Sequence, residues 1–283
     1  MKLLRIGRPG SERPAVLDGD DLIDVSPLVG DYDGAFFAGQ GLETLRTAAA
    51  GGWAGLPRAT GEERIGAPIA RPGTVVCIGM NYAAHAAESG AEPPTAPVVF
   101  LKPPNTVAGP YDTVEIPRAS SKTDWEVELG IVIGRTALYL DSPAQTRNHV
   151  AGFVLANDLS EREWQLEISG GQWSKGKAAP GFTPVGPWLV TADEFDPADA
   201  RLRSSVNGEP RQDSSTADMI FGVDILVWQL SQYMRLDPGD LILTGTPQGV
   251  ALSGRFPYLG AGDVVELEIA GLGSQWQKFV AAL

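Results

Sequence analysis

The chain of 283 residues is poor in cysteine, which limits both its covalent chemistry and its location. Its single cysteine, Cys77, cannot form an internal disulfide bond. The neighbours Val75, Val76 and Ile78 indicate a buried core thiol rather than a nucleophile. A chain without internal disulfide bonds suits a reducing compartment, so we expect a cytoplasmic protein.

Long apolar runs are also missing. No run approaches the roughly eighteen apolar residues that a membrane-spanning helix needs. Arg5 and Arg8 interrupt the opening segment where an export signal would need an unbroken apolar region. We therefore expect a soluble protein with no export signal and no membrane partner.

Positive charge is scarce as well. The 22 Lys and Arg residues face 35 Asp and Glu residues, which gives a formal net charge of -13. Nucleic acids and anionic membranes are bound by clustered Lys and Arg, so this balance argues against both. A small acidic substrate remains compatible, because a metal and a few local cations can reverse the field inside a pocket.

What is present predicts an α+β protein that is mostly β. Residues 1–68 form short apolar segments broken by Gly, Pro and Asp, with one helical stretch at 42–50, and are expected to be a small N-terminal domain. Residues 69–283 are strand-rich and are expected to be the catalytic domain. Strands are expected at 125–133, 150–157, 241–244 and 263–269, and a long helix at 219–234.

Three carboxylates are the most informative feature of the second part. Glu126 and Glu128 are two apart in an apolar strand, so they point to the same face, and Asp158 follows another apolar strand. A solvated outer face is the common alternative for such a pair, but Val132 continues the same face as apolar and indicates burial. Buried anions need a counter-charge, and a hard divalent metal is the natural one.

Polar residues follow Asp158 at helical spacing. If a helix begins at Asp158, then Asp158, Arg162 and Gln165 lie on one face, and Arg162 could hold a carboxylate. The alternative is an ordinary surface arginine paired with Glu161 or Glu167.

His85 is one of two histidines and stands three residues before Glu88 in an alanine-rich helical segment. Neighbours on a helix, they could form a dyad in which the carboxylate orients an imidazole that deprotonates water. A surface hydrogen bond without a role is the alternative, and His149 is expected to be structural. Lys177 lies in a glycine-flanked loop, where a merely solvated lysine is the common alternative. The turn at 244–250 could offer backbone N–H groups to an anion or simply reverse the chain.

Taken in this order, the segments resemble the fumarylacetoacetate hydrolase family. The resemblance implies a mixed β-sandwich or roll as the catalytic domain, a smaller N-terminal domain and assembly as a homodimer. The beginning of the chain and residues 122–129 look most like the branch of ureidoglycolate lyases or 2,4-dioxo-3-deoxy-sugar-acid hydrolases. The resembling segments are 79–88, 100–104, 124–134, 157–165, 176–177, 184–187, 206–208 and 238–250.

The resemblance also implies roles for individual residues. Glu126, Glu128 and Asp158 would ligate Mg²⁺ or Mn²⁺, with Ca²⁺ as an occupant in crystals. His85 with Glu88 would activate water, and Lys177 would contact substrate and assist the reaction. Further substrate contacts would come from Arg162, Gln165 and Thr246.

The activity expected from these roles is hydrolytic C–C cleavage of a 2,4-dioxo acid, either an acylpyruvate or a dioxo-deoxy sugar acid, to pyruvate and a carboxylic acid. The same metal-enolate chemistry serves oxaloacetate decarboxylation or tautomerisation of a 2-oxo acid. A noncatalytic module that a metal stabilises is the alternative of another class.

The sequence departs from the family pattern at two places. Larger members have a further aspartate ligand seven residues before the histidine, where this chain has Ile78, so three protein ligands are expected. After Lys177 many relatives have an aspartate followed by an aromatic residue, whereas residues 178–182 here read Ala-Ala-Pro-Gly-Phe. The contacts of that loop are therefore in question.

Overall fold

Strands dominate the computed structural model, which describes residues 1–88, 90 and 92–282. The larger sheet has ten strands in these residues, in the order β3-β2-β1-β14-β11-β10-β17-β5-β6, with β4 paired to β1. They are β1 (Lys2–Ile6), β2 (Arg13–Asp18), β3 (Asp21–Asp24), β4 (Ile65–Gly66), β5 (Val75–Gly79), β6 (Val98–Lys102), β10 (Val127–Ile133), β11 (Val150–Asn157), β14 (Leu189–Thr191) and β17 (Leu241–Leu243).

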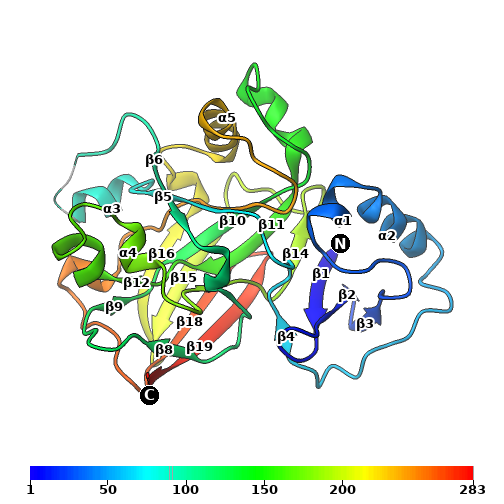
Figure 1. Cartoon of the computed structure of the whole chain (residues 1–283), viewed down its shortest axis with the longest axis horizontal. Helices are drawn as coiled ribbons and strands as arrows, with labels where there is room; N and C mark the ends of the chain where they lie inside the picture. Colours follow the sequence, from blue (N-terminus) through cyan, green and yellow to red (C-terminus); the bar gives the residue numbers. More distant parts are fainter. Residues whose placement is uncertain (89, 91, 283) are drawn as a thin grey trace.

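A second sheet packs face to face on the first (Figure 1). Apolar side chains of both sheets share one core, with Leu129 and Phe153 from the larger sheet and Leu202 and Leu267 from the smaller one. The predicted mostly-β α+β sandwich is confirmed, and neither sheet closes into a barrel among the described strands. The second sheet runs β16 (Glu209–Ser215), β15 (Arg201–Val206), β18 (Val264–Ile269), β19 (Gly273–Ala281) and β8 (Val114–Ile116).

Strand β10 is buried on both faces, as its sequence predicted. Val127, Leu129, Ile131 and Ile133 belong to the core between the sheets, whereas Val132 packs in the core on the opposite side. This alternation follows from the period of two in a strand. Because apolar groups cover both faces, any charge on this strand is removed from water.

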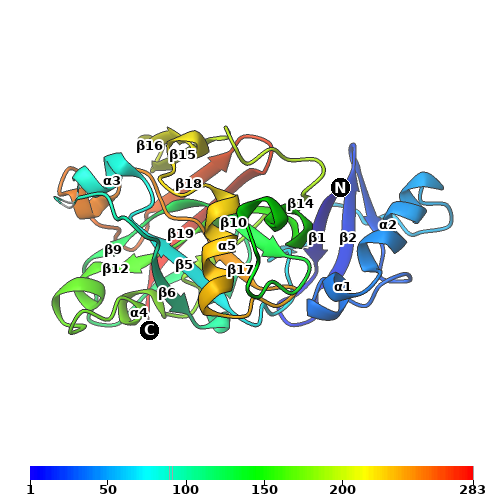
Figure 2. The same cartoon turned by 90° about the horizontal axis from the view of Figure 1, so that it is seen from above.

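The helices are short. Helix α5 packs with its apolar face on the sandwich core, and Figure 2 shows it in front of β10 and β17. Two-residue strands and 3₁₀ segments connect the larger elements. The helices are α1 (Gly34–Ala38), α2 (Gly41–Ala50), α3 (Ala83–Glu88), α4 (Ser174–Lys177) and α5 (Val223–Tyr233); the short strands are β7 (Val107–Ala108), β9 (Thr123–Asp124), β12 (Ser160–Glu161) and β13 (Thr183–Pro184). The 3₁₀ segments are Pro104–Thr106, Pro143–His149, Thr216–Asp218 and Ala251–Ser253, and Glu163–Glu167 is a π-helix.

The sequence predicted a helix at 219–234, and this prediction placed the start of the helix four residues too early. Met219 has extended backbone angles and pairs with Tyr82 in an isolated bridge, and the Ile220 N–H donates to the Asn81 carbonyl. These pairings hold the chain extended until Gly222, so the helix begins at Val223. Its interior and its end agree with the prediction.

Residues 1–68 contain α1, α2 and the meander β1-β2-β3, coloured blue in Figure 1. Strand β1 pairs antiparallel with β14, with Lys2 opposite Val190 and Leu3 opposite Leu189. The N-terminal strands therefore extend the same sheet that carries β10 and β11. The division into domains at residue 68 stays a prediction.

Cys77 lies on β5 and is completely buried, as expected for a core thiol. None of the helices that the structure describes combines the length and the apolar character that a membrane crossing needs.

Candidate active site

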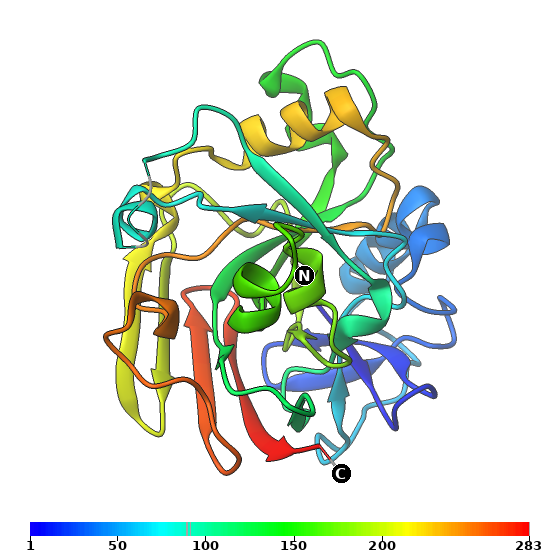
Figure 3. The same ribbon diagram turned by 60° about the vertical axis from the view of Figure 1, so that its left-hand side comes forward.

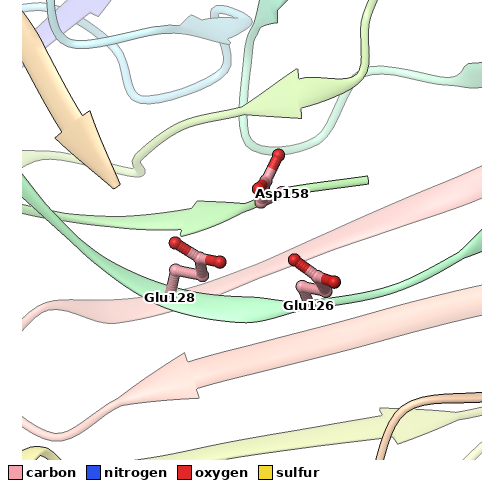
Figure 4. Close-up of side chains that lie close together, drawn as sticks. All are labelled: Glu126, Glu128 and Asp158. Carbon is pink, nitrogen blue, oxygen red and sulfur yellow. The ribbon is translucent and has the colours of Figure 1, made fainter. Parts of the chain in front are cut away.

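The carboxylate trio, Glu126, Glu128 and Asp158, meets at one end of the larger sheet. Glu126 directly precedes β10, Glu128 lies within it, and Asp158 directly follows β11, its antiparallel neighbour. One carboxylate oxygen from each residue lies within 4.8 Å of the other two, and all three residues are buried. Figure 4 shows the two glutamates on one side of their strand, with Asp158 on the neighbouring segment. The predicted convergence is confirmed.

Lys177 and Arg162 contact the trio directly. Lys177 Nζ lies 2.7 Å from Glu126 Oε2 and 2.7 Å from Asp158 Oδ2. Arg162 Nη2 lies 2.6 Å from Glu126 Oε1. Both cations are buried, and pairing of this kind offsets the cost of removing each charge from water.

Lys102 is a third buried cation at the trio, and it was not predicted to take part. Its Nζ lies 2.5 Å from Asp158 Oδ1 and donates hydrogen bonds to the Phe182 and Leu159 carbonyls, at 2.7 and 3.3 Å. The one signal in the sequence is a lysine that ends the apolar run 98–101. The altered loop after Lys177 thus still reaches the site, through the Phe182 carbonyl.

Asp124 anchors Arg162 from the side away from the trio. Arg162 Nε donates to Asp124 Oδ2 at 2.8 Å, and Asp124 also accepts the backbone N–H groups of Ala251 and Leu252. The alternative of a surface arginine is therefore wrong. No helix begins at Asp158: residues 160–161 pair with β9 as strand β12, and a π-helix follows at 163–167.

Negative charge exceeds positive charge in this cluster. Glu128 has no cation in contact among the described residues, and its Oε2 accepts only the Gly245 N–H, at 2.8 Å. The buried anions are thus one more in number than the buried cations. The anions are Glu126, Glu128, Asp158 and Asp124, and the cations are Lys102, Arg162 and Lys177.

The pKa values of Glu126 and Glu128 shift in opposite directions in this environment. Burial, with the neighbouring charges of Asp158 and Glu126, raises the pKa of Glu128 well above its usual value. Burial also acts to raise the pKa of Glu126, but Lys177 and Arg162 outweigh it and lower that pKa. Glu128 is therefore the carboxylate that lacks a counter-charge.

The donor set fits a hard dication such as Mg²⁺ or Mn²⁺. All three ligands would be carboxylate oxygens, which these ions prefer, and each oxygen has a second lone pair beyond the contacts described. One excess negative charge favours a cation at this point. Ile78, where larger family members have an aspartate, is an apolar residue on β5 and offers no ligand.

Gly176 allows α4 to bring Lys177 to the trio. A Cβ at position 176 would lie 2.5 Å from the Glu161 carbonyl oxygen and 2.5 Å from the Gln165 backbone nitrogen. Both contacts are far inside van der Waals distance and involve backbone atoms, which cannot move aside cheaply. Glycine is therefore required for the close approach that places Lys177.

His85 and Glu88 lie on α3, as predicted, at the end of the molecule that Figure 3 turns toward the viewer. His85 Nδ1 lies 3.8 Å from Glu88 Oε2, too far for a direct hydrogen bond. Glu88 Oε2 accepts the Gly249 N–H, and Arg255 lies 3.4 Å from Oε1. Burial acts to raise the pKa of Glu88, but His85 and the Gly249 N–H outweigh it and lower that pKa.

One cavity of about 320 Å³ joins these groups. Its lining includes Glu126, Glu128, Arg162 and Lys177, and it also includes His85 and Glu88. The structure therefore brings the candidate base and the carboxylates to the same space. His149 lies elsewhere, where its Nδ1 contacts the carbonyls of residues 135 and 136.

Gln165 and Thr246 also line the cavity. Gln165 Oε1 accepts from Arg162 Nη1 at 2.8 Å, and its NH₂ group has no partner among the residues that the structure describes. The Thr246 hydroxyl donates to the Val127 carbonyl and accepts from Gln212 Nε2, so its proton is already used. Gln165 is thus the better placed of the two to donate to a substrate.

A family model, the C-terminal domain of fumarylacetoacetate (FAA) hydrolase, matches residues 74–280. A Burkholderia multivorans protein, whose name places it among hydrolases without a substrate, is 49% identical over 287 residues and covers 100% of both chains.

Two solved structures cover 100% of this chain and of their own. One is 5-carboxymethyl-2-hydroxymuconate delta-isomerase from Mycobacterium smegmatis, with 32% identity and a TM-score of 0.79. The other is maleylpyruvate hydrolase from Sphingobium sp. SYK-6 in complex with manganese(II) and pyruvate, with 28% identity and a TM-score of 0.83. With the matched model, the shared fold and the buried trio in agreement, the chain belongs to the fumarylacetoacetate hydrolase family.

Proposed function

We propose that this protein is a metal-dependent hydrolase that cleaves an acylpyruvate, a 2,4-dioxo acid, into pyruvate and a carboxylic acid. The observation that carries the proposal is the cavity that His85 shares with Glu126 and Glu128. Hydrolysis needs a base that activates water and a group that stabilises the charge developing on substrate oxygen. His85, the candidate base, and two of the carboxylates that would hold the metal line the same cavity.

The carboxylate trio would hold the metal. Bound there, Mg²⁺ or Mn²⁺ would supply Lewis-acid chemistry to the oxygens of a 2-oxo acid. With a dication the cluster would carry one excess positive charge in place of one negative charge, which suits an anionic substrate. Similarity to the maleylpyruvate hydrolase solved with manganese(II) and pyruvate supports this assignment.

His85 would act as the general base. Its Nδ1 is turned toward Glu88, which leaves Nε2 to take the proton from a water in the cavity. The water oxygen attacks the C4 carbonyl, the C3–C4 bond breaks, and C3 takes up a proton to become the methyl group of pyruvate. The Glu88 carboxylate would stabilise the imidazolium that forms.

Arg162, Lys177 and Gln165 would orient the substrate. The two cations line the cavity beside Glu126, and Gln165, whose NH₂ group has no partner among the described residues, contacts Arg162. Together they offer positive charge and a hydrogen-bond donor to the substrate carboxylate.

Turnover of acetylpyruvate in ¹⁸O-labelled water tests the proposal. With Mg²⁺ or Mn²⁺ we expect pyruvate, together with acetate that contains one oxygen from solvent. Acetate that contains no solvent oxygen, or no turnover by a protein shown to bind Mn²⁺, would overturn the proposal. The second result would leave the noncatalytic metal-stabilised module.

Similarity to the Mycobacterium smegmatis isomerase favours tautomerisation of an unsaturated 2-oxo acid as a second candidate. That reaction needs proton transfer but no attacking water. It would exchange deuterium from solvent into the substrate carbon skeleton without breaking the C3–C4 bond. Oxaloacetate decarboxylation would release CO₂ and also leave solvent oxygen out of the product acid.

A further inference from the structure

The lining of the active-site cavity combines charged and apolar side chains. Glu126, Glu128, Arg162 and Lys177 supply charged groups, together with Glu88 on α3. A set of apolar side chains lines the cavity beside them. The apolar lining residues are Ile78, Met80, Phe100, Leu166, Trp173 and Leu252.

Phe100 and Trp173 form an aromatic wall of the cavity. Their ring centroids are 5.7 Å apart and their planes meet at 63°, an edge-to-face contact. Lys177 Nζ lies 5.3 Å from the centroid of the Phe100 ring. The wall therefore lies beside the cation that contacts Glu126 and Asp158.

Gly79 makes room for this wall. A Cβ at position 79 would lie 2.3 Å from Cζ3 of the Trp173 indole. Any side chain there would push the indole out of its place against Phe100. Ser174, the next residue, fixes the segment by donating from Oγ to the Leu101 carbonyl at 2.6 Å. The position of the indole is thus set by its neighbours on β5 and β6.

The apolar part of the lining offers no partner for a charged or polyhydroxylated substituent. Among the described lining residues the Lys and Arg cations are Arg162 and Lys177, and both lie beside the carboxylates, where the substrate's own carboxylate is proposed to bind. Glu88, which also lines the cavity, would repel a second carboxylate. A polar group placed there would lose its hydration without gaining partners, whereas an apolar group would gain from burial.

We propose that the acyl group of the substrate is uncharged and aromatic, and that it binds on the Phe100–Trp173 wall. The inference rests on the proposed acylpyruvate hydrolase function and names its substrate class. A cavity of about 320 Å³ is at the small end of ligand sites, which suits a pyruvate unit with one ring-sized substituent. The apolar lining residues, which offer no hydrogen-bond partners to hydroxyl groups, argue against the dioxo-deoxy sugar acids.

Competing substrates test the inference. Wild-type protein with Mn²⁺ is expected to cleave benzoylpyruvate with a kcat/KM at least about tenfold higher than for acetylpyruvate or maleylpyruvate. Trp173→Ala should lower the benzoylpyruvate-to-acetylpyruvate ratio by about tenfold or more. Because Trp173 directly precedes α4, damage to Lys177 would reduce both rates and leave the ratio unchanged. Trp276→Ala, at an exposed tryptophan on β19, is the matched control and should change nothing.

A binding measurement keeps this test separate from turnover. Calorimetry should show that 2-oxo-4-phenylbutanoate, which cannot be hydrolysed, binds more tightly than 2-oxobutanoate, and that Trp173→Ala or Gly79→Val removes the difference. A wild-type preference for acetylpyruvate or maleylpyruvate, or an unchanged ratio in folded Trp173→Ala, would overturn the inference alone. Absence of any acylpyruvate cleavage would overturn the proposed function. The calorimetric comparison would still test whether an aromatic group binds on the Phe100–Trp173 wall.

Discussion

Lys102 Nζ lies 2.5 Å from Asp158 Oδ1, and both side chains are almost completely buried. The pair links β6 to the residue after β11, so it joins two strands that are not neighbours in the sheet. Lys102 also holds the Phe182 and Leu159 carbonyls. Removing Asp158 would leave the buried Lys102 cation without its carboxylate, and removing Lys102 would leave Asp158 with Lys177 as its one contacting cation among the described residues.

Replacing Lys102 with Met should lower the free energy of unfolding by roughly 3 kcal/mol, because it leaves the Asp158 carboxylate and two carbonyls without this donor. Urea denaturation measures the loss. Added Mn²⁺ should recover part of it, since a dication would replace the missing positive charge. Lys278→Met, at an exposed lysine on β19, is the control, and equal stability of the two variants would contradict the prediction.

Replacing Glu128 with Gln should have opposite effects on stability and on metal binding. The amide removes one of several buried like charges, so the metal-free protein should gain thermal stability. Affinity for Mn²⁺ should fall by at least about tenfold, because ligand charge sets the affinity of oxygen sites. Electron paramagnetic resonance measures free Mn²⁺ directly. Unchanged Mn²⁺ affinity would exclude Glu128 as a ligand, and Glu266→Gln, at an exposed glutamate on β18, serves as the comparison.

Replacing His85 with Gln should reduce kcat for acylpyruvate cleavage at least roughly a hundredfold if His85 is the base. The glutamine keeps a polar group but cannot accept a proton near neutral pH. His149→Gln provides a matched control, because this second histidine contacts backbone carbonyls far from the cavity. A coupled assay for pyruvate measures both. Full turnover by the His85 variant would rule out the assigned role.

Loss of the Arg13 ion pairs should lower the free energy of unfolding at acidic pH. Burial acts to raise the pKa of Asp24, but hydrogen bonds from Ser26 and Arg13 outweigh it and lower that pKa below its usual value. A group with a lowered folded-state pKa stabilises the fold above its unfolded pKa, about 3.9, and loses that contribution as pH falls toward the folded value. Between pH 6 and pH 3, Asp24→Asn should therefore lose less free energy of unfolding than the wild-type protein does, as measured by urea denaturation. Asp20→Asn, on an exposed turn, is the control. An equal dependence of the free energy of unfolding on pH in the two variants would contradict the prediction.

Cys77 should not react with thiol reagents in the native protein. Burial raises the pKa of its thiol well above the usual value, and the thiolate is the reactive form. At pH 8 we expect no labelling by a chromogenic disulfide in buffer and one equivalent in urea, since the chain has one cysteine. Rapid labelling without denaturant would show that β5 opens far more readily than its burial implies.

The carboxylate trio was predictable because strand periodicity is local. A period of two places Glu126 and Glu128 on one face, and the apolar residue Val132 on that face indicates burial. Lys102 was not predictable in this way. Its partners Leu159 and Phe182 are 57 and 80 positions away, and only the fold brings them together.

Helix boundaries show the same limit. The apolar spacing at 219–234 is compatible with one helix, but backbone pairing with residues 81 and 82 keeps the first residues extended. The helix expected after Asp158 fails for a similar reason, because residues 160–161 pair with β9. In both cases a contact distant in sequence decides a local conformation.

The pairing of β1 with β14 has a consequence for truncation. Strand β14 has β11 on one side and β1 on the other, so without residues 1–68 its second row of N–H and C=O groups would be open to water. An exposed edge of this kind is a template on which other chains add strands. A fragment of residues 69–283 would keep every residue of the proposed site and yet be expected to self-associate into aggregates.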